Sequence, residues 1–118
     1  MLFRSRCYQK SLAAGHCVNT DSANTLADGM AVRVPNAEAL QMMSGNVAEI
    51  VAVSDEEVLQ AMSCFFHDTH NVAEGAGAAA LAALLQQCDR YRDKKLGVVL
   101  SGGNVDSCVY ARALTLQA

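Results

Sequence analysis

The sequence has no tryptophan, a single proline and only 5% aromatic residues, and charged residues make up 18% of its 118 positions. With so few bulky rings, its core has to consist of small side chains, alanine above all, in closely packed helices. Basic residues are scattered and the net charge is −3, which argues against a nucleic-acid partner, because that function needs a concentrated positive face. We expect residues 1–118 to form a single domain.

Long apolar runs and paired cysteines are missing as well. No run approaches the roughly 18 residues of a membrane span, and "MLFRSR" has too short an apolar stretch for a secretory signal. The five cysteines are an odd number, lie far apart and include no C-x-x-C, so neither a disulfide framework nor a zinc knuckle is indicated. These features predict a cytoplasmic protein with reduced thiols and no membrane partner.

One cysteine does lie at a spacing that zinc ligands can adopt. Cys64, His67 and His70 follow one another at intervals of three along a predicted helix, which places their side chains on a drifting stripe. The polar end of an ordinary helix gives the same spacing, so the spacing alone is weak evidence for a metal site. We expect these three residues to bind no metal.

Apolar spacing and capping residues predict most of the secondary structure. Helical patterns cover residues 4–14, the segment "AEALQMMSGN", residues 55–70, residues 75–88 and the chain from Val105 onward. Ser54 and Glu57 have the capping-box form, which places the start of the third helix at Asp55. The turn-forming residues between the first two helices predict a long loop. Two apolar runs, "EIVAVS" and "LGVVL", predict strands at 49–53 and 96–100, the second fully buried.

The order of these elements predicts an α/β fold with a partial open parallel sheet and flanking helices. Two apolar strands about 40 residues apart are typical of parallel strands joined by right-handed crossovers. Two strands make a poor sheet, because a stable sheet normally has more strands and is covered on both faces. The sequence therefore has the character of part of a larger structure.

Ligands in open α/β sheets bind beyond the carboxyl ends of the strands, where the second strand would place Ser101, Gly102, Gly103 and Asn104. Two glycines allow the backbone to approach a flat ligand closely, and the Ser101 hydroxyl can donate and accept hydrogen bonds. A tight turn before a helix has the same composition. Glu74, directly before a glycine-rich helix start, is explained as well by helix capping as by function.

Four segments together are more specific than any one of them. The chain resembles the C-terminal part of the serine/threonine dehydratases (threonine ammonia-lyases), which are fold-type II pyridoxal-phosphate enzymes, with the fold of the tryptophan synthase β chain. "CYQKSLAAG" also resembles the helix that precedes these motifs, so only residues 1–6 fall outside the resemblance, as an unrelated extension. The segments occur in the order and at the spacing of that family: "TLADGMAV", "VAVSDEEVLQAM", "AEGAGAAALAAL" and "LGVVLSGGNVD".

The resemblance implies roles for individual residues. Ser101 would hydrogen-bond the pyridine nitrogen of pyridoxal phosphate, and Glu74 would stand near the cofactor ring. Gly102, Gly103 and Asn104 would shape the rim of the pocket, and "TLADG" would lie at its wall. A neutral hydroxyl at the ring nitrogen need not force protonation of the ring, which suits β-elimination from threonine or serine.

The family also needs a lysine that forms a Schiff base with the cofactor and a glycine-rich loop for its phosphate. This sequence has neither at a matching position, since its lysines are Lys10, Lys94 and Lys95. A carboxylate-containing stretch that binds a divalent cation in serine racemase-like members is replaced by "FRSR", whose Arg4 and Arg6 would repel magnesium or calcium. We expect a gene fragment without catalytic residues, inactive alone and unable to hold pyridoxal phosphate by itself.

Two further interpretations stay open. The chain can be a subunit of a split dehydratase that a separately encoded N-terminal half completes, or a structural module in which residues 101–104 hold a small anion. Sheet edges and apolar helix faces that such a segment leaves exposed predict self-association, with a symmetric homodimer as the simplest form.

Overall fold

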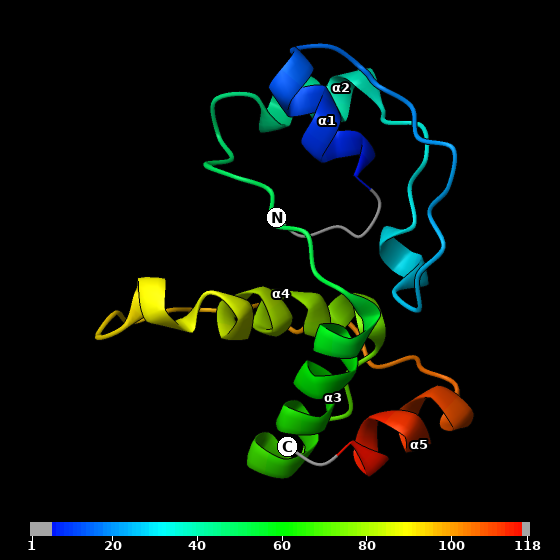
Figure 1. Cartoon of the computed structure of the whole chain (residues 1–118), viewed down its shortest axis with the longest axis vertical. Helices are drawn as coiled ribbons and strands as arrows, with labels where there is room; N and C mark the ends of the chain where they lie inside the picture. Colours follow the sequence, from blue (N-terminus) through cyan, green and yellow to red (C-terminus); the bar gives the residue numbers. More distant parts are fainter. Residues whose placement is uncertain (1–5, 117–118) are drawn as a thin grey trace.

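The computed structural model describes residues 6–116, which form helices joined by long loops (Figure 1). Within that range no helix is both long and apolar enough to cross a bilayer. Residues 1–5, which include Arg4 and the predicted start of the first helix, lie outside the described residues. The elements are α1 (Cys7–Ala14), η1 (Asp28–Met30), α2 (Ala37–Met43), α3 (Asp55–Thr69), α4 (Gly75–Gln86), η2 (Cys88–Tyr91) and α5 (Ser107–Thr115).

The helix ends confirm the predicted stop and start residues. α1 ends at Gly15, whose φ of 74° is the left-handed conformation that glycine adopts without strain. At the start of α3, the Ser54 side chain accepts from the Glu57 N–H at 3.2 Å, and Glu57 Oε2 accepts from the Ser54 N–H at 2.6 Å. α3 ends before His70, as its apolar pattern predicts.

The capping box also perturbs the ionisation of Glu57. Burial pulls the pKa of this carboxyl upward, but hydrogen bonds from Ser54 and Gln86 outweigh the burial and hold the pKa below its ordinary value. A depressed carboxyl pKa stabilises the folded state above the ordinary pKa of the group, and this contribution is lost as the pH falls through the lowered value. Near neutral pH the capping box is therefore fully formed.

Both predicted strands are wrong for this chain. Val51 forms an isolated β-bridge in the first segment, and residues 96–100 belong to no helix, turn or strand. The second segment is exposed rather than buried, with 47% of Leu96, 37% of Val98 and 75% of Val99 accessible to solvent. A strand is stabilised by cross-strand neighbours, and residues 6–116 supply none beside these segments. The partial parallel sheet is therefore absent from the described chain, and only the flanking helices are formed.

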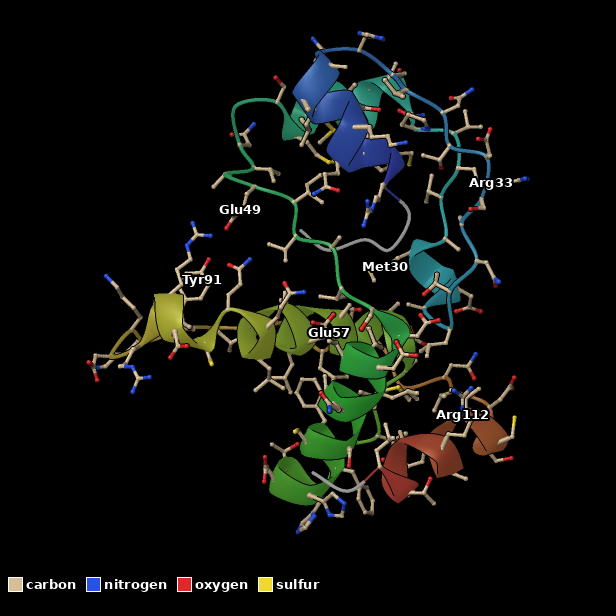
Figure 2. All side chains as sticks on the ribbon, viewed as in Figure 1. Met30, Arg33, Glu49, Glu57, Tyr91 and Arg112 are labelled. Atoms are coloured by element: carbon tan, nitrogen blue, oxygen red, sulfur yellow. The ribbon has the colours of Figure 1, made fainter. Side chains whose placement is uncertain are left out.

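Buried side chains form two separate hydrophobic clusters. The larger one joins α3, α4 and α5, and the alanines of α4 allow it to approach α3 closely. The smaller one joins α1 and α2 around Cys7, Tyr8 and Leu40. Figure 1 shows α1 and α2 lying apart from the other three helices. Met30 of η1 packs against both clusters, and Figure 2 shows it between them.

Candidate functional site

Glu74 connects the start of α4 to the SGGN loop, residues 101–104, which precedes α5. Its backbone N–H donates to the carbonyl oxygen of Gly102 at 3.0 Å. Its carboxylate reaches the same loop, because Oε2 accepts from the backbone N–H of Asn104 at 3.1 Å. No hydrogen bond joins the Glu74 side chain to its own helix. Glu74 therefore holds the SGGN loop rather than acting as a conventional helix cap.

Glycines occur where the loop and the helix approach most closely. A Cβ atom at Gly77 would lie 2.5 Å from the Gly102 carbonyl oxygen, and one at Gly102 would lie 2.5 Å from Glu74 Oε1. At Gly103 a Cβ atom would lie 2.6 Å from the carbonyl oxygen of Val72. At Gly77 and Gly103 the near atom belongs to the backbone, so neither position has room for a side chain, whereas at Gly102 the Glu74 carboxylate would have to move. The glycine-rich start of α4 therefore serves to seat the SGGN loop directly on the helix.

Asp55 fixes a third segment, the loop at residues 25–30, beside the same helix end. Its Oδ1 accepts from the Thr25 hydroxyl at 2.7 Å and from the Leu26 N–H at 3.3 Å. Leu26 in turn abuts α4, since a Cβ atom at Gly75 would lie 2.5 Å from Leu26 Cδ1. Sequence reasoning identified Asp55 only as the first residue of a helix, and missed that it positions the "TLADG" loop predicted to lie at the wall.

A small cavity of about 150 Å³ lies where these three segments meet. Three carboxylate side chains line it, from Asp28, Glu74 and Asp106, together with Asn104. An anion there would meet like charges, which cost binding free energy. The cavity therefore argues against the interpretation in which the SGGN loop holds a small anion.

The predicted site residues differ in how they are held. Glu74 and Gly102 are half-buried at the contact with α4, whereas Ser101, Gly103 and Asn104 are exposed. The expectation that Ser101 follows a buried strand is wrong, because residues 96–99 are exposed and unpaired. The argument from a buried strand for a cofactor wall is lost with it. A role for Ser101 in cofactor binding then depends on similarity to known proteins.

The described residues fit one edge of pyridoxal phosphate and not the whole group. The accessible Ser101 hydroxyl and the adjoining glycine backbone suit the edge of a flat ring. Lys10 belongs to α1, which packs in the smaller cluster. Lys94 and Lys95 are exposed and follow η2, so they lie past the C-terminal end of α4, whereas Gly75 is at its N-terminal end (Figure 1). The 12 residues of α4 alone span about 18 Å. Among the described residues, no amine is placed beside the SGGN loop.

Cys64, His67 and His70 lie at the end of α3. The His70 ring lies with Nδ1 3.1 Å from the Phe66 carbonyl oxygen, and its φ of 56° ends the helix. The rings of His67 and His70 both pack edge-on against Phe66, with centroids 5.5 and 6.5 Å away. Within residues 6–116, no three His, Cys, Asp or Glu side chains converge as metal ligands.

We predict that the purified protein contains far less than one zinc ion per chain. The two histidines pack on Phe66, and no three His, Cys, Asp or Glu side chains within residues 6–116 come together as the ligands of a tetrahedral zinc site must. Elemental analysis of the protein and of its His67→Ala variant measures this directly. Stoichiometric zinc that disappears in the variant would contradict the prediction.

Known proteins are similar to this chain in sequence and in fold. A family described as "Pyridoxal-phosphate dependent enzyme" matches residues 4–102. L-threonine ammonia-lyase of Thermotoga maritima is 40% identical over 96 residues, which are 81% of this chain and 24% of that protein. L-threo-3-hydroxyaspartate ammonia-lyase of a Pseudomonas species is 33% identical over 106 residues, 90% of this chain and 33% of that protein.

Solved structures agree with the sequence matches. A threonine deaminase from T.th. superposes with a TM-score of 0.80 at 32% identity, over 87% of this chain and 38% of that one. Maize serine racemase gives a TM-score of 0.81 at 25% identity, over 96% of this chain and 36% of that one. The resemblance inferred from the four sequence segments is confirmed. This chain spans about a quarter to a third of the length of these curated relatives.

Proposed function

Because this chain belongs to the pyridoxal-phosphate dependent enzyme family, we propose that its SGGN loop forms the ring side of a cofactor site of the threonine/serine dehydratase type. The observation that supports the proposal best is the attachment of this loop to α4 through both the backbone and the carboxylate of Glu74. Two hydrogen bonds and the glycine contacts give the loop one fixed position. A site for a rigid, planar cofactor needs such a preorganised surface.

Each residue of the loop has a distinct part in the proposal. Ser101 donates its hydroxyl hydrogen to the ring nitrogen, which a neutral hydroxyl can do without a full positive charge forming there. Gly102 and Gly103 allow the backbone to approach the ring, and Asn104 lies at the rim. Glu74 acts as a positioning residue because it holds the loop from behind. When bound, pyridoxal phosphate supplies the electron sink for loss of the α-proton of an amino acid.

The proposed substrates are 3-hydroxy amino acids. Relatives named for threonine and for L-threo-3-hydroxyaspartate match this chain at 33 to 40% identity, and both substrates carry a β-hydroxyl as leaving group. Loss of the α-proton and of that hydroxyl, followed by hydrolysis, yields a 2-oxo acid and ammonia. None of the described residues is placed to carry out these proton transfers. We therefore propose that the chain supplies the ring side of a site and that other polypeptide supplies the amine and the phosphate loop.

A chimera tests this role of Ser101. In the Pseudomonas relative, the 106 matched residues are replaced by those of this chain. We expect the chimera to retain pyridoxal phosphate, seen as visible absorbance, and Ser101→Ala to lower 2-oxo acid release about tenfold, which corresponds to one lost hydrogen bond. Ser107→Ala, at an exposed position in the first turn of α5, is the matched control and should leave the rate unchanged. Equal rates in both variants would exclude this role of Ser101.

We also predict that the chain by itself forms a symmetric dimer at micromolar concentration. Val98 and Val99 expose 37% and 75% of their surface beside an unpaired backbone, and burying them in a second copy removes apolar area from water. Sedimentation velocity measures the state directly. Val99→Asp should shift it towards monomer, whereas Met42→Asp, on α2 at the same 75% exposure, should not. A stable monomer of the unmodified chain would contradict the prediction.

A further inference from the structure

Two loops line the small cavity beside the start of α4, and each is held by a carboxylate at the start of a helix. Glu74, directly before α4, accepts from the Asn104 N–H of the SGGN loop at 3.1 Å. Asp55, the first residue of α3, accepts from the Thr25 hydroxyl and from a backbone N–H of the TLADG loop, residues 25–29. The two carboxylates therefore have equivalent parts, one for each loop.

The Thr25 hydroxyl extends the hold of Asp55 along the TLADG loop. It donates to Asp55 Oδ1 at 2.7 Å and accepts from the Ala27 N–H at 3.2 Å. Ala27 is buried, with 2% of its surface exposed, and Asp28, which lines the cavity, follows it directly. A hydroxyl can serve as donor and acceptor at once, whereas the methyl group of a valine can serve as neither. Asp55 therefore fixes this loop as far as the residue that lines the cavity.

The TLADG loop rests on the first turn of α4 with little room to shift inward. A Cβ atom at Gly75 would lie 3.1 Å from the Ala27 Cα, and one at Gly29 would lie 3.2 Å from the Ala76 Cβ. η1, which begins within this loop, contacts α4 (Figure 1). The SGGN loop rests on the same turn of α4, at Gly77. An outward movement of the TLADG loop would therefore remove one wall of the cavity.

Like charges favour such an outward movement. Asp28, Glu74 and Asp106 all line the cavity, and neighbouring ionised carboxylates repel one another. Hydrogen bonds to an ionised acceptor are roughly twice as strong as those between neutral groups, so the two bonds that Asp55 accepts oppose this repulsion. Removing the Asp55 carboxylate would let Asp28 move further into water.

We propose that Asp55 is a positioning residue of the cofactor site, which keeps the TLADG loop in place beside the SGGN loop through the Thr25 hydroxyl. The inference rests on the proposed function, because it assigns Asp55 to that same site. In this role Asp55 contacts neither cofactor nor substrate. Retention of pyridoxal phosphate then depends on a hydrogen-bond acceptor at position 55 and on a hydroxyl at position 25.

Hydrogen exchange in the chain by itself tests the hold on the TLADG loop. In Asp55→Ala we expect the amides of Leu26 and Ala27 to exchange about tenfold faster, as loss of one hydrogen bond requires. The Asn104 amide, in the other loop, should keep its rate. Glu56→Ala, at an exposed position in the same turn of α3, is the matched control and should change none of the three rates. Unchanged exchange at Leu26 and Ala27 in Asp55→Ala would overturn the inference.

Cofactor binding by the chimera with the Pseudomonas relative tests the positioning role. The dissociation constant for pyridoxal phosphate, followed by visible absorbance, should rise about tenfold in Asp55→Ala and in Thr25→Val. Asp55→Asn and Thr25→Ser keep the acceptor and the hydroxyl, so both should restore the value of the unmodified chimera. The double variant should bind no more weakly than Asp55→Ala, because both substitutions act through one hydrogen bond. If Asp55→Asn binds as weakly as Asp55→Ala, the charge of Asp55 acts and the inference is wrong.

The outcomes separate this inference from the proposed function. Suppose that Ser101→Ala leaves turnover of the chimera unchanged, while Asp55→Ala weakens cofactor binding and Asp55→Asn restores it. The cofactor role of Ser101 is then rejected and the positioning role of Asp55 is supported. In the opposite case, Ser101→Ala lowers turnover and Asp55→Ala binds the cofactor as tightly as Glu56→Ala. The proposed function then stands and the inference is overturned.

Discussion

The chain by itself is expected to release no 2-oxo acid from threonine or serine, even with pyridoxal phosphate in excess. The reaction needs a lysine amine bonded to the cofactor and a positioned base for the α-proton. Lys10 is an exposed residue of α1, and Lys94 and Lys95 lie beyond the far end of α4 from the SGGN loop. Without these groups the rate enhancement of an enzyme, about 10⁶-fold or more, is lost entirely.

The assay follows 2-oxo acid formation from both substrates, with the Thermotoga maritima relative as the positive control. Borohydride treatment before the assay shows where the cofactor reacts, and we expect it to label exposed lysines without preference. The unmodified chain and Ser101→Ala should give the same background rate. Turnover that Ser101→Ala abolishes would show that the chain assembles a working site alone or through its own oligomer. The proposal that other polypeptide supplies the amine and the phosphate loop would then be wrong.

Helices could be predicted from this sequence because their end signals are local. The capping box of Ser54 and Glu57 lies within one turn of α3, and Gly15 ends α1 by its own backbone conformation. The strand at 96–100 could not be predicted in the same way. Its apolar pattern is typical of a segment in the interior of a sheet, but a strand forms only beside neighbours, and residues 6–116 provide none for it.

The candidate site shows the same division between local and distant information. The motifs at Glu74 and residues 101–104 are recognisable in the sequence, and the structure joins them through the Asn104 N–H and the Gly102 carbonyl oxygen. The hydrogen bond of Asp55 to Thr25 spans 30 residues, and no spacing rule connects them. No spacing rule predicts the contact of Gly77 with Gly102 either, because a glycine near a helix start indicates flexibility at least as often as close packing.

We expect Gly77→Ala to destabilise the protein by about 1–2 kcal/mol, although alanine normally stabilises a helix interior relative to glycine by up to about 1 kcal/mol. The added Cβ would lie 2.5 Å from the Gly102 carbonyl oxygen, a backbone atom that already accepts the Glu74 N–H. The loop cannot move away without losing that hydrogen bond. Overpacking of this kind costs about 1–3 kcal/mol, which exceeds the gain in helix propensity.

Gly97→Ala is the matched control, because no atom lies within 4 Å of a Cβ built there. Its stability should stay within about 0.5 kcal/mol of the unmodified chain. Urea unfolding of the three proteins at equal m-value gives the difference, and hydrogen exchange at the Asn104 amide reports whether the bond to Glu74 Oε2 survives. If Gly77→Ala is as stable as Gly97→Ala and the Asn104 amide is unprotected in all three proteins, the SGGN loop does not rest on α4 in solution. In that case the preorganised surface on which the proposed function depends is absent.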